Sequence, residues 1–446
     1  MKNKISEKQN FSGYQKNLSS CRIYIETYGC SSNKNDSAIM SGLLNDAGYK
    51  IVNDLDSANL IILNTCIVKS VTENRIRFRV GELKKTGKNL IVAGCMAEAE
   101  SETIRKIAPY ASLVGTNSIT RITEAVENMS NGKRVEFLGK IKIEKVSLPK
   151  TKYSPVIDII EICSGCNYAC SFCATKFAKG SLLNYSPDKI LNDAKGAIAD
   201  SCKELWITGQ DVAAYNFNDT RLPELVEKLL SIGSANYFLR LGMMHPKSVM
   251  SILDELIDVY KNARIFKFIH LPVQSGSNAV LKAMGRNHTT EDFFDIVNAF
   301  RKKIPDITIW TDIIVGFPGE NEDDFLQSIK LLERIKPDFT NVSCYGARPN
   351  TKAAKMKQLP TALKKQRTSM MSALASKLAL EQNKKWIGWR GNIIIDEYKK
   401  NNWLGRNYVY KPVAVKGAFN ATLGSTIETR IVDARKTCLI GEPIRI

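Results

Sequence analysis

The feature that most constrains the fold is a regular alternation of short apolar runs with amphipathic stretches through the middle of the chain. The apolar runs occupy residues 156–162, 204–207, 237–241, 265–269, 307–315 and 339–344. Strands that alternate with helices usually form parallel βα units. Six such units predict an open (βα)₆ partial barrel over residues 155–384, with its chemistry at the carboxyl ends of the strands.

The sequence on either side of this barrel predicts two further units, an α/β domain before it and a β-barrel after it. Residues 21–130 also alternate strand-like and helix-like patterns, which indicates a doubly wound parallel α/β domain. Residues 385–446 carry short alternating runs, including 408–410 and 413–415, which predict a small OB-like β-barrel. We expect residues 1–20 to form a polar tail, and the Lys-rich residues 131–154 to form a linker.

Three cysteines directly follow the first barrel strand. Cys166, Cys170 and Cys173 have the spacing C-x₃-C-x₂-C. Three thiolates can hold three irons of a 4Fe–4S cubane, which leaves the fourth iron free to bind the amino and carboxylate groups of S-adenosylmethionine. The alternative is a zinc site, because Cys163 and Cys166 also form a C-x₂-C hook.

A second set of cysteines is dispersed along the N-terminal part. Cys30, Cys66 and Cys95 each follow an apolar strand run, in IYIETYGC, LIILNTC and LIVAGC. The carboxyl ends of parallel strands meet at one edge of a sheet, so these thiols are predicted to converge on a second site. The alternative is three ordinary buried cysteines.

Loops after the later barrel strands supply candidates for contacts with S-adenosylmethionine. WITGQD, RLGMMHP, HLPVQSGS and VGFPGE each follow a predicted strand, and the glycine of the first leaves room for a ligand close to the backbone. The candidate contacts are Phe172, Gly209, Gln210, Arg240, Gln274 and Val315.

The charge of the chain favours a polyanionic partner over a merely solvated surface. Its formal net charge is +19, which suits RNA. Basic and aromatic residues of the C-terminal segment either contact RNA or belong to a solvated surface with core aromatics; they are Arg390, Lys399, Lys400, Trp403, Arg406, Tyr408, Tyr410, Lys411 and Lys416. We find neither a membrane span nor a signal peptide, so we expect no membrane partner and a cytoplasmic protein.

With these motifs in view, the chain resembles the radical SAM methylthiotransferases over nearly its whole length. TYGCSSNKNDS, NTC and AGCMAE are similar to the auxiliary-cluster domain of that family. CNYACSFCATKFAKG, HLPVQSGS, TDIIVGFPGE and YGARPNTKAAKM are similar to its radical SAM core, and GRNYVYKPV to its RNA-binding TRAM barrel. TYGCS followed by N-x-x-D resembles the archaeal and eukaryotic branch, which acts on N6-threonylcarbamoyladenosine at tRNA position 37.

The resemblance implies two 4Fe–4S clusters, one on each cysteine triplet, and two uses of S-adenosylmethionine. One molecule would methylate a sulfur on the auxiliary cluster, and a second would give the radical that removes hydrogen from the adenosine, making its 2-methylthio derivative. We expect an electron donor like flavodoxin or ferredoxin, while the sulfur donor is unknown.

Two residues depart from the family pattern, and three other functions stay open. Asn350 stands in RPNT where RPGT is commoner, and Lys179 stands where an Arg is usual. The alternatives are methylthiolation of another tRNA adenosine, methylthiolation of a ribosomal protein, and a non-enzymatic zinc-containing RNA-binding protein.

Overall fold

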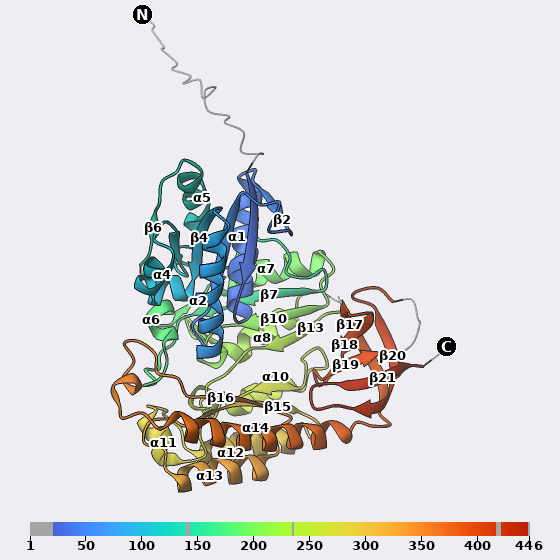
Figure 1. Cartoon of the computed structure of the whole chain (residues 1–446). Coiled ribbons are helices and arrows are strands. Elements are labelled where there is room, and N and C mark those ends of the chain that lie inside the picture. The colour runs from blue at the N-terminus through green and yellow to red at the C-terminus, as the bar shows by residue number, and fades with distance from the viewer. Residues whose placement is uncertain (1–20, 140–142, 234–235, 416–420, 445–446) are drawn as a thin grey trace, which may run out of the picture.

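The chain forms three successive folded units, from the top to the lower right of Figure 1. The structure is a computed structural model, and it describes residues 21–139, 143–233, 236–415 and 421–444. The predicted polar tail, residues 1–20, and Lys416 lie outside the described residues. The α/β class, the partial barrel and the small β-barrel are confirmed.

The first unit is a parallel sheet with strand order β2-β1-β3-β4-β5-β6. Its strands are β1 (Arg22–Thr27), β2 (Lys50–Val52), β3 (Leu60–Thr65), β4 (Asn89–Gly94), β5 (Ser112–Gly115) and β6 (Glu136–Phe137). Its helices are α1 (Ser31–Asp46), α2 (Ser70–Lys85), α3 (Cys95–Ala99), α4 (Ser101–Ile107) and α5 (Ile122–Ser130).

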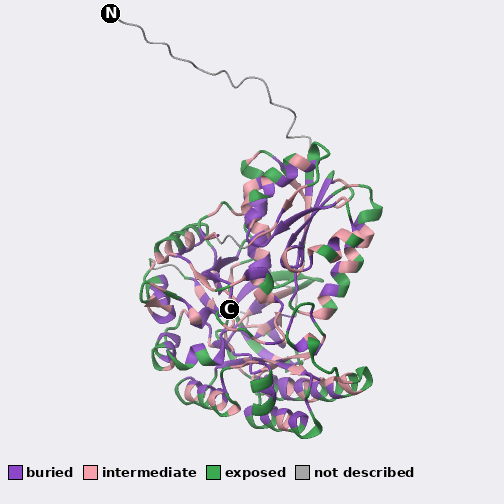
Figure 2. Cartoon of the chain, turned by 90° about the vertical axis from the view of Figure 1, so that its left-hand side faces the viewer, coloured by how far each residue is buried: buried purple, intermediate pink, exposed green. Residues whose placement is uncertain are grey.

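Both faces of this sheet are covered, as a doubly wound domain requires. Residues of α1 and α5 share one apolar core, and residues of α2 and α4 share another on the opposite face. Figure 2 shows the buried strands enclosed between the helices. Residues 131–154 were expected to form a linker, but part of this segment belongs to the sheet. Its residues 136–137 pair with β5 and complete the sheet.

The second unit is the partial barrel, whose parallel strands follow the order of the chain. They are β7 (Ile157–Glu161), β10 (Glu204–Thr208), β13 (Phe238–Leu241), β14 (Phe268–His270), β15 (Thr308–Val315) and β16 (Phe339–Cys344). Parallel bridges from Leu239 to Ile265 and from Met243 to His270 join its two halves. The outer helices are α7 (Pro187–Ala199), α8 (Leu222–Leu230), α9 (Pro246–Met250), α10 (Leu253–Tyr260), α11 (Asn278–Ala283), α12 (Thr290–Lys303), α13 (Glu322–Ile335) and α14 (Thr361–Lys384). The loops contain two short antiparallel pairs and a helix. One pair is β8 (Cys163–Ser164) with β9 (Leu183–Asn184), which enclose helix α6 (Thr175–Lys179), and the other is the hairpin of β11 (Asn216–Phe217) and β12 (Thr220–Arg221).

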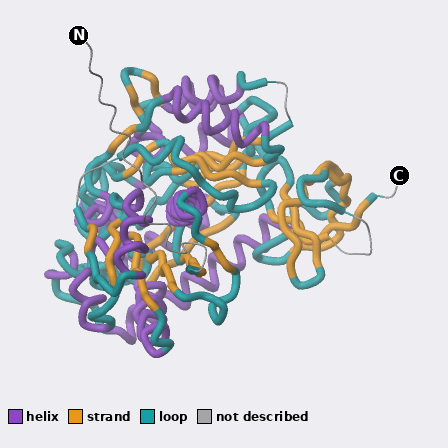
Figure 3. The backbone as a smooth tube through the Cα atoms, turned by 90° about the horizontal axis from the view of Figure 1, so that it is seen from above, coloured by secondary structure: helices purple, strands orange, loops and turns teal. Residues whose placement is uncertain are grey.

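The third unit is a closed barrel of order β17-β18-β19-β21-β20, set apart at the right of Figure 3. Its strands are β17 (Arg390–Lys399), β18 (Asn402–Arg406), β19 (Pro412–Val415), β20 (Thr426–Ala434) and β21 (Leu439–Pro443). The strand expected at residues 408–410 is absent, because the segment turns there: Tyr410 has φ +63° and donates its N–H to the Asn407 carbonyl at 2.8 Å.

The small barrel docks on the partial barrel through buried aromatic rings. The Tyr410 ring lies 4.9 Å from those of Phe266 and Phe268, and 6.4 Å from that of Trp206. Within the described part of the chain, no helix combines the length and the apolar character that crossing a membrane needs.

Candidate metal centres

The first cysteine triplet lies on a loop that leaves β7 at the carboxyl edge of the barrel. The loop is fixed at its start, where Cys166 donates its N–H to the Gly180 carbonyl at 3.2 Å. It is fixed again at Ser171, whose N–H donates to the Met284 carbonyl at 2.8 Å and whose hydroxyl donates to the Ala283 carbonyl at 2.9 Å. All three thiols are free and partly exposed, so they are available as ligands.

Cys163, the possible fourth ligand of a zinc site, lies in the apolar core instead. Its side chain is completely buried, and its thiol donates to the Asp211 carbonyl at 3.7 Å. Four zinc ligands must all reach one ion at about 2.3 Å. Among the described residues, no three His, Cys, Asp or Glu side chains lie close enough to share a single metal ion. Thiols that each bind a different iron of a cubane need not meet that condition.

The second triplet converges around Asn33, as the topology predicts. Cys30 ends the loop after β1, Cys66 follows β3, and Cys95 begins α3 directly after β4. The thiols of Cys30 and Cys95 both donate to Asn33 Oδ1, at 3.7 and 3.8 Å. A Cβ atom on Gly29 would lie 3.0 Å from Cys66 Sγ, so this thiol lies against the Cys30 loop. The residues therefore fit a group larger than one ion.

The polar environment of Asn33 fixes its orientation. Its amide nitrogen donates to the carbonyl of Tyr28 at 2.9 Å and to that of Thr65 at 2.7 Å. The carbonyl oxygen is thereby turned toward the two thiols. Asn33 and Asp36 are the Asn and Asp of the N-x-x-D motif, but the motif gave no sign that Asn33 would lie among the cysteines.

Burial raises the pKa of most of these thiols. The pKa of Cys66 and that of Cys166 are raised to about 11, and the pKa values of Cys95 and Cys170 are also raised by burial. These four thiols are therefore protonated near neutral pH when no metal is bound. Binding of iron as thiolates releases these protons.

Arg348, which sequence reasoning did not single out, holds the Cys66 loop against the barrel. Its guanidinium donates to the carbonyls of Ile67 at 3.2 Å and Val68 at 2.8 Å, and it pairs with buried Glu73. The RPNT motif that contains Arg348 was the available signal. Asn350 of the same motif has φ +65°, a conformation that Gly adopts freely and Asn tolerates, which accounts for the exchange of Gly for Asn.

A buried group of four charges joins the two triplets. Lys145 lies 2.6 Å from Asp36 of α1, and Lys179 lies 3.3 Å from Glu161 at the end of β7. Lys179 also lies 3.9 Å from Asp36. All four side chains are at most 1% exposed. The two acids and two bases balance, as buried charges require.

The two sites are close because α6 packs directly on the second triplet. Cys95 shares a small apolar cluster with Ala174, which follows Cys173, and with Ala178 of α6. The loop that leaves the first triplet thus touches a ligand of the second. Gln210 lies between the sites as well: it accepts the Gly165 N–H at 2.6 Å and donates to the Ser32 hydroxyl at 3.4 Å.

The other expected S-adenosylmethionine contacts divide into two groups. Gln274 has φ +79° and a buried amide oxygen without a hydrogen-bond partner, and Phe172 lies half-buried beside Met284 and Phe317. Gln274 thus keeps features of a ligand site, because backbone strain and unpartnered polar atoms gather at such sites. Phe172 keeps only a partly exposed ring between two of the cysteines.

Three other expected contacts are engaged elsewhere. A Cβ on Gly209 would lie 2.6 Å from Cys163 Sγ. The space beside this glycine is therefore filled by the Cys163 side chain and is not free for a ligand. Val315 packs in the main apolar core. The Arg240 guanidinium lies over the rings of Trp206, Phe268 and Tyr410, which contact the C-terminal barrel.

A polar chain crosses the interior of the barrel beside these sites. Lys69 donates to Asn341 Oδ1 at 2.6 Å, and Asn341 donates to Asp312 Oδ1 at 2.6 Å. The other Asp312 oxygen lies 2.7 Å from His270 Nε2. Although burial raises the pKa of Asp312, its interaction with His270 and its hydrogen bond from Asn341 leave this pKa below its usual value.

The C-terminal barrel uses several of its expected RNA contacts for packing instead. Tyr410 is buried, and Lys411 is buried between Asp338 at 2.7 Å and Asn383 at 2.8 Å. Arg406 pairs with Asp396 at 2.9 Å. A basic and aromatic tip remains at the β17–β18 hairpin, formed by the exposed Tyr398, Lys399 and Lys400 and the half-buried Trp403. The rings of Tyr398 and Trp403 lie 4.6 Å apart.

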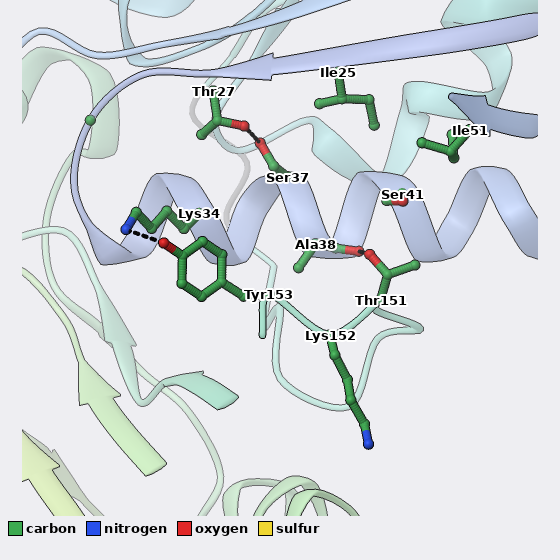
Figure 4. A pocket seen from close by; sticks show the side chains of 11 residues that line it. Ile25, Thr27, Lys34, Ser37, Ala38, Ser41, Ile51, Thr151, Lys152 and Tyr153 are labelled. Carbon is green, nitrogen blue, oxygen red and sulfur yellow. Dashed lines mark hydrogen bonds between the residues drawn. The ribbon is translucent and has the colours of Figure 1, made fainter. Parts of the chain in front are cut away.

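A cavity of about 390 Å³ lies next to the second triplet, between α1, the β1–β2 edge and residues 151–153 (Figure 4). Its lining includes Gly29, the neighbour of Cys30, and the hydroxyls of Thr27 and Ser37, which lie 2.7 Å apart. Lys34 and Tyr153 also line it, and Lys34 donates to the Tyr153 hydroxyl at 2.6 Å. The cavity therefore offers hydroxyl groups and a cation beside an exposed thiol.

Comparison with known proteins agrees with this geometry. The Radical SAM superfamily matches residues 160–332, and the uncharacterized protein family UPF0004 matches residues 22–115. A probable threonylcarbamoyladenosine tRNA methylthiotransferase of Pyrococcus abyssi is 41% identical, over 94% of this chain and 99% of the relative. The threonylcarbamoyladenosine tRNA methylthiotransferase of Homo sapiens is 34% identical, over 95% of this chain and 74% of the relative.

A solved structure shares the fold at low identity. The radical S-adenosylmethionine methyltransferase TsrM from Kitasatospora setae superposes with a TM-score of 0.56 at 14% identity, covering 75% of each chain.

Proposed function

This chain belongs to the threonylcarbamoyladenosine tRNA methylthiotransferases, which are radical SAM enzymes, and we propose that its two cysteine triplets divide the reaction between them. Its substrate is tRNA, and its cofactors are S-adenosylmethionine and the 4Fe–4S cluster of the radical SAM family. The proposed product is the 2-methylthio derivative of N6-threonylcarbamoyladenosine at tRNA position 37.

Cys166, Cys170 and Cys173 are the proposed ligands of the radical cluster. When bound, that cluster supplies the electron that cleaves S-adenosylmethionine, and the protein orients both. Gln274 and Phe172 are the side chains best placed to contact S-adenosylmethionine, since one has an unpartnered buried oxygen and the other a half-buried ring beside the loop.

Cys30, Cys66 and Cys95 are the proposed ligands of a second cluster that carries the sulfur. The observation that carries the proposal is the contact of Cys95 with Ala174 and Ala178. Sulfur held on the second triplet would lie beside the loop of the first, where a radical on the adenosine is made. The packing of α6 against Cys95 also restricts water at this junction, which protects a reactive radical.

Recognition of the tRNA involves the exposed β17–β18 tip in this proposal. Lysines bind the backbone phosphates, and the ring pair of Tyr398 and Trp403 offers a surface on which an unpaired base can stack. We further propose a cytoplasmic location and an electron donor like flavodoxin or ferredoxin, whose small charged surfaces suit a strongly basic chain.

Iron analysis tests the assignment of the clusters. After anaerobic reconstitution, the wild-type chain is expected to hold about eight irons, four for each cubane. Replacing Cys30, Cys66 and Cys95 by Ala should leave about four, and so should replacing Cys166, Cys170 and Cys173. A wild-type chain that holds only about four irons, all lost with the first triplet, would contradict the second cluster.

A further inference from the structure

Arg286 stands out because it is a cation that faces the first cysteine triplet. Its Nη1 atom lies 3.8 Å from Cys170 Sγ, within reach of an N–H···S hydrogen bond. Its Nη2 atom donates to the Pro272 carbonyl at 2.8 Å, which fixes the guanidinium plane. Its charge acts on the buried Asp211 carboxyl, but among the described residues no ion pair joins Arg286 to a carboxylate, and its buried Nε has no hydrogen-bond partner.

The segment before Arg286 is built to hold this side chain on the cysteine loop. The end of α11 receives two hydrogen bonds from Ser171, between the ligands Cys170 and Cys173. Gly285 then takes φ +70°, and a Cβ there would lie 3.4 Å from the Ala169 carbonyl. The chain therefore turns sharply over the loop and places Arg286 beside Cys170.

The neighbouring histidines do not contribute positive charge. Burial, together with the charge of Arg286, lowers the pKa of His245 to about 2 and that of His288 to about 3. Both rings are thus neutral at physiological pH. Of Arg286 and these two histidines, Arg286 alone carries a positive charge, and it faces the Cys170 sulfur. Lys176 is a second cation beside the loop, but its ammonium donates to the Cys166 carbonyl rather than to a sulfur.

We propose that Arg286 is a positioning and tuning residue of the radical cluster, donating an N–H to the Cys170 sulfur and favouring the reduced form of the cluster. The inference rests on the proposed function, because it requires a cluster on Cys166, Cys170 and Cys173. A cluster held by thiolates gains negative charge on reduction, so a nearby cation and a hydrogen bond to sulfur raise its reduction potential. The electron donor then reduces it more readily.

A redox titration followed by electron paramagnetic resonance tests this. The full-length chain is used with Cys30, Cys66 and Cys95 replaced by Ala, so that one cluster gives the signal. In Arg286→Gln, the ratio of reduced to oxidised cluster at a fixed potential should fall about tenfold, which is about 59 mV for one electron. Arg286→Lys keeps the positive charge but loses the planar set of guanidinium donors. Its midpoint potential should therefore fall, but by less than that of Arg286→Gln.

Lys282→Gln is the matched control, because Lys282 is an exposed cation on α11 and its loss removes the same charge. An unchanged midpoint in Arg286→Gln at unchanged iron content, or an equal shift in Lys282→Gln, would overturn the inference. If Arg286→Gln fails to hold iron, the midpoint potential of Arg286→Lys decides. A midpoint equal to that of the parent protein overturns the inference, and a midpoint below that of the parent supports it. Absence of iron from the parent protein would instead overturn the proposed function.

Discussion

Single buried side chains set the relation between the two cysteine triplets. Lys179 follows the first triplet, yet its ammonium lies 3.3 Å from Glu161 and 3.9 Å from Asp36 of the N-terminal unit. The sequence showed Lys179 only as a departure from an expected Arg, because ion-pair partners 18 and 143 residues away leave no local signal. The Lys ammonium suits this position because it interacts with two carboxylates, whereas an Arg guanidinium typically binds a single carboxylate in a bidentate way.

Removing the Lys179 charge should destabilise the protein strongly. Lys179→Met leaves two buried carboxylates facing only Lys145, and loss of one partner from a buried pair costs about 3–5 kcal/mol. Urea unfolding under anaerobic conditions measures the effect. Lys189→Met is the control, because the Lys189 side chain is 53% exposed in its ion pair with Glu144, and ion pairs near the surface contribute about 0–1 kcal/mol. Equal losses in the two variants would contradict the structural role of Lys179.

Glu204 should make the stability of the barrel junction depend on pH. Burial, with the Asp396 charge, raises the pKa of Glu204 to about 7. The folded state therefore holds this proton more tightly than the unfolded state, whose pKa is near 4.5. Between these values, stability contributed by Glu204 falls as pH rises.

Glu204→Gln should abolish this fall in stability with rising pH, because the amide side chain stays neutral. The melting temperature of the variant relative to wild type should therefore increase as the pH is raised from about 5 to about 8, where the carboxyl ionises. A difference in melting temperature that is constant over this range would refute the account of Glu204.

At the scale of secondary structure, the strands were predictable and their irregular neighbours were not. The barrel strands and the three Cys-bearing strand ends follow from apolar runs of strand length. Residues 408–410 also read as a strand, but Tyr410 is held by the aromatic rings of another unit in a left-handed turn. Tertiary packing overrode the local pattern there. Likewise β6, only two residues long, carries too little sequence to be recognised within a Lys-rich segment.

The β17–β18 hairpin tip should contribute directly to tRNA binding. Tyr398→Ala is expected to weaken binding by about 1–3 kcal/mol, the contribution of stacking one base on an aromatic ring. Replacing Lys399 and Lys400 by Ala should reduce the salt dependence of the affinity, because fewer counterions are released. Filter binding at several salt concentrations measures both. Lys261→Ala, which changes an exposed lysine on the partial barrel, should behave as wild type; unchanged binding by the tip variants would place the RNA elsewhere.

At the scale of the whole molecule, function depends on how the units meet. The convergence of the first triplet was predictable from its spacing and that of the second from the order of its strands, but the approach of one triplet to the other was not, because it arises from Cys95 packing on Ala174 and Ala178. Arg348 and the group of Lys145, Asp36, Lys179 and Glu161 hold the two units together at this junction. The arrangement accounts for a division of labour between a radical-forming site and a sulfur-carrying site.

Mass spectrometry of the products tests this division most directly. The purified chain is incubated with S-adenosylmethionine, a strong reductant and tRNA that carries N6-threonylcarbamoyladenosine, and both the tRNA nucleosides and 5′-deoxyadenosine are measured. Wild type should yield the 2-methylthio nucleoside, and the variant with Cys30, Cys66 and Cys95 replaced by Ala should yield 5′-deoxyadenosine without it. The account would be contradicted if that variant formed the methylthio nucleoside. It would also be contradicted if wild type failed to form it.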